Sequence, residues 1–115
     1  MANRFRYDID IFKGTTPNFL FRLLQSSGDP PVSSPINLTG YEASMSIGWK
    51  DDLIRKIMTI NALAGEITTT LSTSDSRAIP ADGSASYEIE VRPTAGDQIV
   101  EIYGTIKAHG GYSDD

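Results

Sequence analysis

Apolar and polar residues alternate along several short stretches of the chain. In the clearest one, from Tyr41 to Trp49, every second residue is apolar or aromatic and the residues between are small or polar. Residues 5–12, 85–91 and 99–109 follow the same period of two. Because successive side chains of a strand point to opposite faces of a sheet, each stretch predicts a strand with a buried face.

Three further stretches predict strands without such regular alternation. Residues 19–25 are apolar on both faces but short, aromatic and flanked by turn-forming residues, which favours a strand over a helix. Residues 61–72 predict a turn and then a strand, because the second half is rich in Thr. Residues 51–60 fit a helical spacing as well as a strand. We expect a turn followed by a strand at 55–60, with the helix left as the alternative.

Turn signals separate these stretches. The segment 13–18 contains a Gly and a Pro, which favour a turn. The segment 26–35 holds three Pro, four Ser and one Gly, and it predicts a loop. One helical turn is expected near 73–78, because Ser72 and Asp75 have the spacing of a capping box.

The order of elements predicts an all-β protein, an antiparallel immunoglobulin-like β-sandwich of about seven strands with one short helical turn. A length of 115 residues favours a single domain over 1–115. We expect a flexible N-terminal arm (1–4) and a flexible C-terminal tail (109–115). The inward positions of the predicted strands, together with Leu38 of the loop before 41–49, give the expected core: Leu38, Tyr41, Met45, Ile47, Trp49, Ile67, Leu71, Tyr87, Ile89, Val91, Ile102 and Ile106.

The charge and composition exclude several classes of function. A net charge of −5 with scattered basic residues argues against binding to nucleic acid or to an anionic membrane. The absence of Cys removes disulfides, thiolate catalysis and zinc–sulfur sites. The N-terminus lacks the apolar run of a signal peptide, and the sequence has no apolar stretch of membrane-spanning length. We therefore expect synthesis in a cytoplasm.

Residues that could perform chemistry are few. His109 is the only His and stands beside two Gly residues, which is typical of a surface position. Glu88 and Glu90 share a strand face, and we interpret them as its solvated side and not as a catalytic pair. The acidic pairs lack the spacing of a calcium loop. We expect no enzyme activity, no cofactor and no metal. Trp49 with Tyr41 offers an alternative role as a sugar-binding platform.

The order of several short motifs resembles a known structural module. The segments "INLTGYEASMSIGW", "GEITTTLS", "AIP", "YEIEV" and "GTI" follow one another as they do in a small β-sandwich module of tailed-bacteriophage structural proteins. The module is similar to the N-terminal domain of phage baseplate upper proteins. The chain differs in its Pro-rich loop at 26–35 and in carrying no fibre-binding region after residue 115. That second difference favours a small accessory or adaptor protein.

The resemblance implies a non-enzymatic virion structural protein of the tail or baseplate, or a tail-fibre adaptor. Such a protein would be made in the host cytoplasm, reside in the virion, and act by homo-oligomeric assembly with other virion proteins. The alternatives are a carbohydrate-binding or adhesion module, a capsid decoration protein, and an inhibitor of a host protein. The candidate interface residues are Arg4, Arg6, Pro30, Pro31, Tyr103 and Tyr112.

Overall fold

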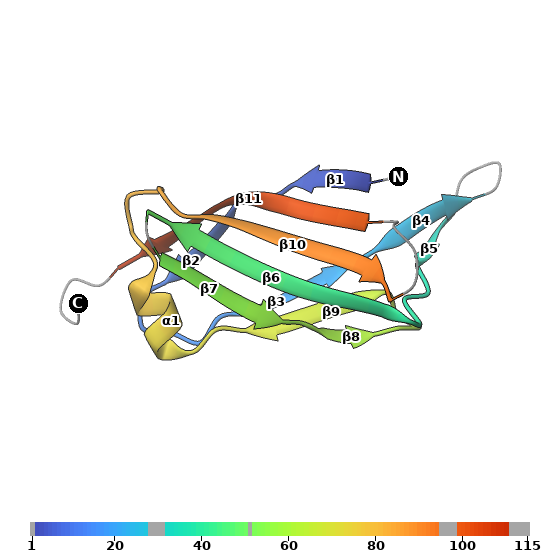
Figure 1. Ribbon diagram of the computed structural model, residues 1–115, viewed down its shortest axis with the longest axis horizontal. Helices are drawn as coiled ribbons and strands as arrows, with labels where there is room; N and C mark the ends of the chain where they lie inside the picture. Colours follow the sequence, from blue (N-terminus) through green and yellow to red (C-terminus); the bar gives the residue numbers. More distant parts are fainter. Residues whose placement is uncertain (1, 28–31, 51, 95–98, 111–115) are drawn as a thin grey trace.

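A large twisted sheet forms one layer of the protein. The computed structural model describes residues 2–27, 32–50, 52–94 and 99–110. Within them the large sheet has the strand order β1 (Ala2–Arg6), β11 (Ile99–His109), β10 (Ser86–Pro93), β6 (Tyr41–Trp49) and β7 (Asp52–Ile57). A sixth strand, β2 (Ile9–Phe12), also pairs with β11 (Figure 1).

A smaller sheet forms the second layer. Its order is β3 (Asn18–Arg22), β9 (Glu66–Thr70) and β8 (Thr59–Asn61), and the hairpin of β4 (Leu24–Ser27) with β5 (Val32–Pro35) projects from the body (Figure 1). β7 and β8 follow each other through Met58, whose N–H donates to the Ala43 carbonyl at 2.9 Å. The chain therefore crosses between the layers on this side, whereas β1 and β3 are the outermost strands of their sheets on the other side.

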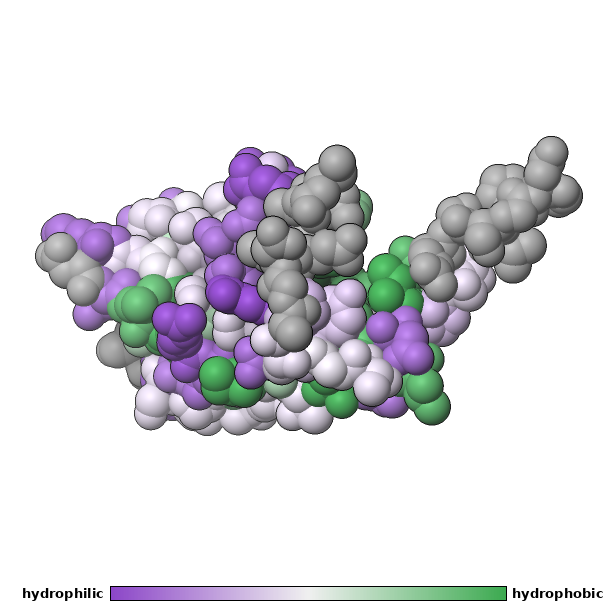
Figure 2. All heavy atoms as spheres, turned by 45° about the vertical axis from the view of Figure 1, so that its right-hand side comes forward, coloured by the Kyte–Doolittle hydropathy of each residue, from purple (hydrophilic) through white to green (hydrophobic). Residues whose placement is uncertain are grey.

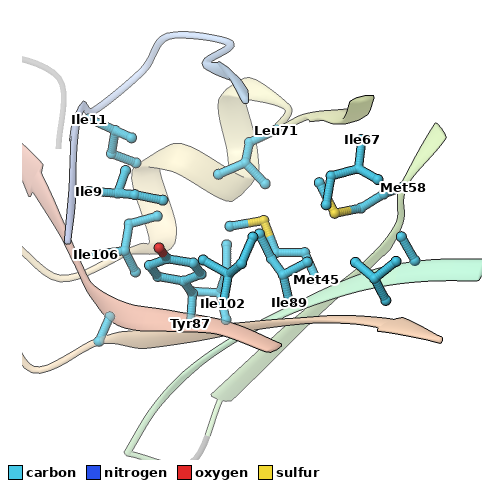
Figure 3. Packing of buried hydrophobic residues seen from close by; sticks show 14 of the residues in the cluster. Ile9, Ile11, Met45, Met58, Ile67, Leu71, Tyr87, Ile89, Ile102 and Ile106 are labelled. Carbon is cyan, nitrogen blue, oxygen red and sulfur yellow. The ribbon is translucent and has the colours of Figure 1, made fainter. Parts of the chain in front are cut away.

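The hydrophobic core lies between the two layers. Figure 3 shows Met45 and Ile89 of the large sheet lying across from Ile67 of the small sheet. Tyr41 and Trp49 are only partly buried and pack against this core from the two ends of β6. The other ten positions of the expected core are buried: Leu38, Met45, Ile47, Ile67, Leu71, Tyr87, Ile89, Val91, Ile102 and Ile106.

A short helix, α1 (Thr73–Ala78), stands where the capping-box spacing predicts it. The Ser72 hydroxyl accepts from the Asp75 N–H at 3.1 Å, and the Asp75 carboxylate accepts from the Ser72 N–H at 3.3 Å. Asp75 also accepts from the Lys56 ammonium at 2.7 Å, and this bond lowers the pKa of its carboxyl. The cap therefore fastens α1 to β7 as well as starting the helix.

The all-β sandwich is confirmed, with more strands than the seven expected. The stretch 5–12 divides into β1 and β2, and most of the predicted loop 26–35 belongs to the β4–β5 hairpin. The helical alternative for 51–60 is wrong, because these residues form β7 and β8 from Asp52 onward. In each case the structure depends on pairing with neighbouring strands, and the sequence of a single stretch does not reveal that pairing.

The two ends of the described chain also differ from expectation. Residues 2–4 belong to β1, in place of the expected flexible arm 1–4, because their backbone pairs with β11. This pairing and that of β2 are parallel, whereas the other strand pairs are antiparallel. His109 ends β11, and the rest of the expected tail after Gly110 lies outside the described residues.

Candidate interaction surface

The edge formed by β1 and β11 brings together three of the candidate interface residues. Arg4 lies opposite Glu101 in the parallel register, and Arg6 lies opposite Tyr103. The Arg4 Nε donates to Glu101 at 2.6 Å, and its guanidinium stacks over the Tyr103 ring at 4.3 Å from the centroid. These contacts lie on the face of the sheet away from the core, since the alternate residue Ile102 is buried.

The chain bends between β1 and β2 at Tyr7 and Asp8. The Tyr7 N–H donates to the Tyr103 carbonyl at 2.8 Å, and the buried Tyr87 hydroxyl donates to the Tyr7 carbonyl. The Asp8 carboxylate accepts from the Thr105 N–H at 3.0 Å, and this bond lowers the pKa of Asp8. Backbone and side chain together therefore fix the bend against β10 and β11.

Gly104 makes this close approach sterically feasible. A Cβ at position 104 would lie 2.8 Å from the Asp8 carboxylate oxygen and would overlap the Tyr7 carbonyl. Real Cβ atoms do not approach other atoms this closely, so the bend requires Gly at this place in β11. The sequence shows a Gly inside a strand pattern, which is a signal of close backbone approach.

The inward-alternating residues of 5–12 do not share one environment. Ile9 and Ile11 are buried, and Figure 3 shows them beside Ile106 of β11. Phe5 and Tyr7 are 56% and 60% exposed, although the period of two places them on the same face. The expectation of a buried face over all of 5–12 is therefore wrong for Phe5 and Tyr7, which lie in and just after the edge strand β1, beyond which the described residues place no further strand.

An apolar groove of about 540 Å³ opens beside these exposed rings. It runs between the β1–β11 edge and the β3–β4 segment, with Arg6 and Arg22 at its rim. Tyr7 and Phe21 approach edge to face across it, with ring centroids 6.0 Å apart. Figure 2 shows hydrophobic residues gathered where the projecting hairpin leaves the body of the protein. The groove extends the core to the surface on the side where β1 and β3 are the outermost strands.

The outer face of the large sheet carries an acidic strip beside this edge. Glu90 lies opposite Glu101 on the neighbouring strand, and Glu88 lies one step further along β10. A hydrogen bond between Glu88 and Glu101 raises the pKa of Glu88, with desolvation and nearby negative charge acting in the same direction. Arg4 and Arg92 pair with Glu101 and Glu90 and offset part of this charge.

Other candidate residues lie apart from the β1–β11 edge. His109 pairs with Asp10 at 2.8 Å on the exposed surface. In the described part of the chain, no group of three or more His, Cys, Asp or Glu residues is arranged to hold a metal ion, and no helix is long and apolar enough to cross a membrane. Pro30, Pro31 and Tyr112, also expected at an interface, lie outside the described residues.

The fold has a counterpart among solved structures. The N-terminal domain of phage TP901-1 ORF48 matches this chain with a TM-score of 0.57 over 95% of this chain and 98% of that domain, at 7% sequence identity. No protein-family model matches the chain, and no curated protein matches it. At this identity the likeness shows a shared fold. It agrees with the sandwich that the resemblance to a phage module implies.

Proposed function

We propose that the chain is a non-enzymatic structural protein of a bacteriophage virion, a tail or baseplate component or a tail-fibre adaptor. It would be made in the host cytoplasm and would act in the particle by assembly of identical copies with other virion proteins. The observation that carries this proposal is the end-to-end likeness to a phage protein domain, which covers nearly all of both chains.

The β1–β11 edge supports an assembly role. The outer side of β1 has no neighbouring strand among the described residues, so its backbone groups are free to pair with another chain. Arg4, Arg6 and Tyr103 surround this edge, and Arg and Tyr are enriched at protein interfaces. The apolar groove beside it adds surface that is favourable to bury.

The test is the location of the chain in purified phage particles. We expect mass spectrometry to find it at a fixed ratio to a major tail protein through successive density gradients. An abundant host cytoplasmic protein is the control and should fall away with each step. The proposal fails if the chain is lost with this control. Immunogold labelling of the particles then separates a tail position from the capsid-decoration alternative.

The carbohydrate-binding alternative depends on an exposed aromatic platform. Trp49 packs against the hydrophobic core and is partly buried, which removes much of the ring from contact with a sugar. The structure therefore favours the assembly proposal over glycan recognition.

A further inference from the structure

β1 is the strand of the large sheet whose described side chains are the least buried. It occupies the end of the strand order and pairs, within the described residues, with β11 alone. From Arg4 to Arg6 every side chain is exposed, whereas β2, β6, β10 and β11 each bury alternate residues. Backbone pairing and the Arg4 contacts therefore hold most of this strand, and the hydrophobic core contributes little to it.

The residues that follow β1 are fixed far more firmly. Tyr7 and Asp8 make hydrogen bonds with Tyr103, Tyr87 and Thr105, and Gly104 lets their backbone lie against β11. β2 then buries Ile9 and Ile11 in the core. The boundary between weak and firm attachment falls between Arg6 and Tyr7. This boundary separates a segment whose described side chains are exposed from one that is hydrogen-bonded and then buried.

The surface that β1 would vacate is complementary to β1 itself. Glu101 accepts from Arg4 at 2.6 Å, and the Tyr103 ring receives the same guanidinium at 4.3 Å. The β1 segment of a second copy would meet the same carboxylate, the same ring and the same backbone register. A second copy of this chain is therefore the partner whose chemistry fits this edge.

We propose that β1 is exchanged between copies, so that residues 2–6 of one chain pair in parallel with β11 of a neighbouring chain. Exchange of an identical element replaces each lost contact with an equal one, so it is a low-cost route to assembly. The exchanged segment has five residues, which span about 17 Å in extended form along the neighbouring β11. Head-to-tail exchange of this kind closes into a ring when the rotation between copies permits it.

The inference rests on the proposed function for its purpose, but its test uses the purified chain. The sequence has no Cys, so single cysteines can be placed freely. Arg4→Cys and Glu101→Cys chains are prepared separately, mixed at high concentration and oxidised. These positions are register partners on adjacent strands about 4.8 Å apart, within disulfide range. We expect a disulfide-linked heterodimer, with positions 4 and 101 joined in its peptide map.

The matched control pairs Arg4→Cys with Arg92→Cys, an exposed position on β10 that does not lie beside β1. Exchange predicts that the 4–101 heterodimer forms at least tenfold faster than the 4–92 product. The double variant Arg4→Cys/Glu101→Cys tests whether positions 4 and 101 can be joined within one chain. If that disulfide closes and the 4–101 and 4–92 products form at equal rates, the inference is overturned. In phage particles, a chain that carries only the intrachain disulfide would overturn exchange and leave the proposed function standing. If the purified chain exchanges β1 but is absent from phage particles, the exchange stands and the proposed function fails.

Discussion

At the scale of single residues, Gly104 decides whether the N-terminal segment can lie against β11. In Gly104→Ala the new methyl group would overlap the Tyr7 carbonyl and crowd Asp8. We expect the free energy of unfolding to fall by about 1–3 kcal/mol, as for other overpacked sites. Urea unfolding followed by the fluorescence of the single Trp measures this change.

Gly48→Ala on β6 is the control for this substitution. A Cβ at position 48 would meet Leu53 at 3.6 Å, an ordinary contact, so little loss of stability is expected. Equal losses in the two variants would show that the close approach at Gly104 does not limit stability.

The hydroxyl of Tyr87 reaches from β10 to the same bend. Its burial raises the pKa of Tyr87 to about 12, above the ordinary value of 10.0. A raised folded-state pKa means that this contribution to stability is complete below pH 10 and is lost as the pH rises toward 12. Tyr87→Phe should cost about 1 kcal/mol at pH 8 and less at pH 11.5, because the hydroxyl then favours the unfolded state. Urea unfolding at the two pH values checks this, and an equal cost at both would contradict it.

At neutral pH, Glu88 lowers the stability of the folded state, whereas Tyr87 raises it. The folded state raises the pKa of its carboxyl, chiefly through the hydrogen bond with Glu101. Its contribution to stability is therefore present below pH 4.5 and is lost as the pH rises through the folded-state pKa. We expect Glu88→Gln to gain roughly 0.2–0.5 kcal/mol at pH 7, because Glu88 is exposed and its charge is screened by solvent. The gain should vanish near pH 3.

Chemical unfolding at pH 7 and pH 3 measures this difference. Glu42→Gln is the control, because Glu42 lies opposite Arg92 in the register, whereas Glu88 makes a hydrogen bond with the carboxyl group of Glu101. A stability gain in Glu42→Gln as large as that in Glu88→Gln would mean that loss of any surface acid is enough.

At the scale of elements, α1 is tied to the turn before β3 by one buried hydroxyl. The Ser76 Oγ donates to the Thr15 carbonyl at 2.7 Å and accepts from the Gly14 N–H at 3.1 Å. Ser76 is fully buried, so Ser76→Ala would leave two backbone groups without this partner. We expect a loss of about 1–3 kcal/mol in the free energy of unfolding, measured by urea titration.

Ser74→Ala on the same helix provides the comparison. Ser74 is exposed, so its substitution removes no buried hydrogen bond and should change stability by less than about 0.5 kcal/mol. Both variants replace Ser with Ala within α1. A similar loss in both would therefore assign the effect to the helix and not to its bond with the turn.

Strands and helices that depend on residues close together in the sequence could be predicted from it. The strand 41–49 is found where its alternation places it, and α1 follows from the spacing of Ser72 and Asp75. The division of 5–12 could not be predicted, because it depends on Gly104, which is distant in sequence and opposite in space. The role of Ser76 could not be predicted either, because its hydrogen-bond partners lie about sixty residues away in the sequence.

The candidate surface shows the same limit. The period of two in 5–12 correctly placed Phe5 on the same face as Ile9, but it could not tell that Phe5 stays 56% exposed while Ile9 is buried. Arg4, Arg6 and Tyr103 meet at one edge because β1 pairs in parallel with β11, which the antiparallel expectation did not include. Their role in an interface stays a prediction.

At the scale of the whole molecule, the chain is less compact than its length allows. Its radius of gyration is 15.6 Å, against about 13 Å for a typical compact domain of this length. Its accessible surface of 7150 Å² exceeds the roughly 6,200 Å² that a typical monomer of 12.5 kDa exposes. The projecting hairpin and the groove beside β1 account for this shape in part. A chain that buries less surface in itself gains more from burying surface against a neighbour.

Assembly through β1 therefore makes thermal stability depend on concentration. When unfolding also separates the chains, a hundredfold rise in concentration stabilises a dimer by about 2.7 kcal/mol through mass action. For the Arg4→Cys/Glu101→Cys chain we expect the melting temperature of the reduced form to rise by several degrees over this range. Oxidation within one chain holds β1 on its own β11, and the melting temperature should then stay constant with concentration. Calorimetry on the two forms of one molecule makes the comparison. A parallel rise in both would mean that the copies associate through another surface, such as the exposed Leu53 and Ile57 of β7.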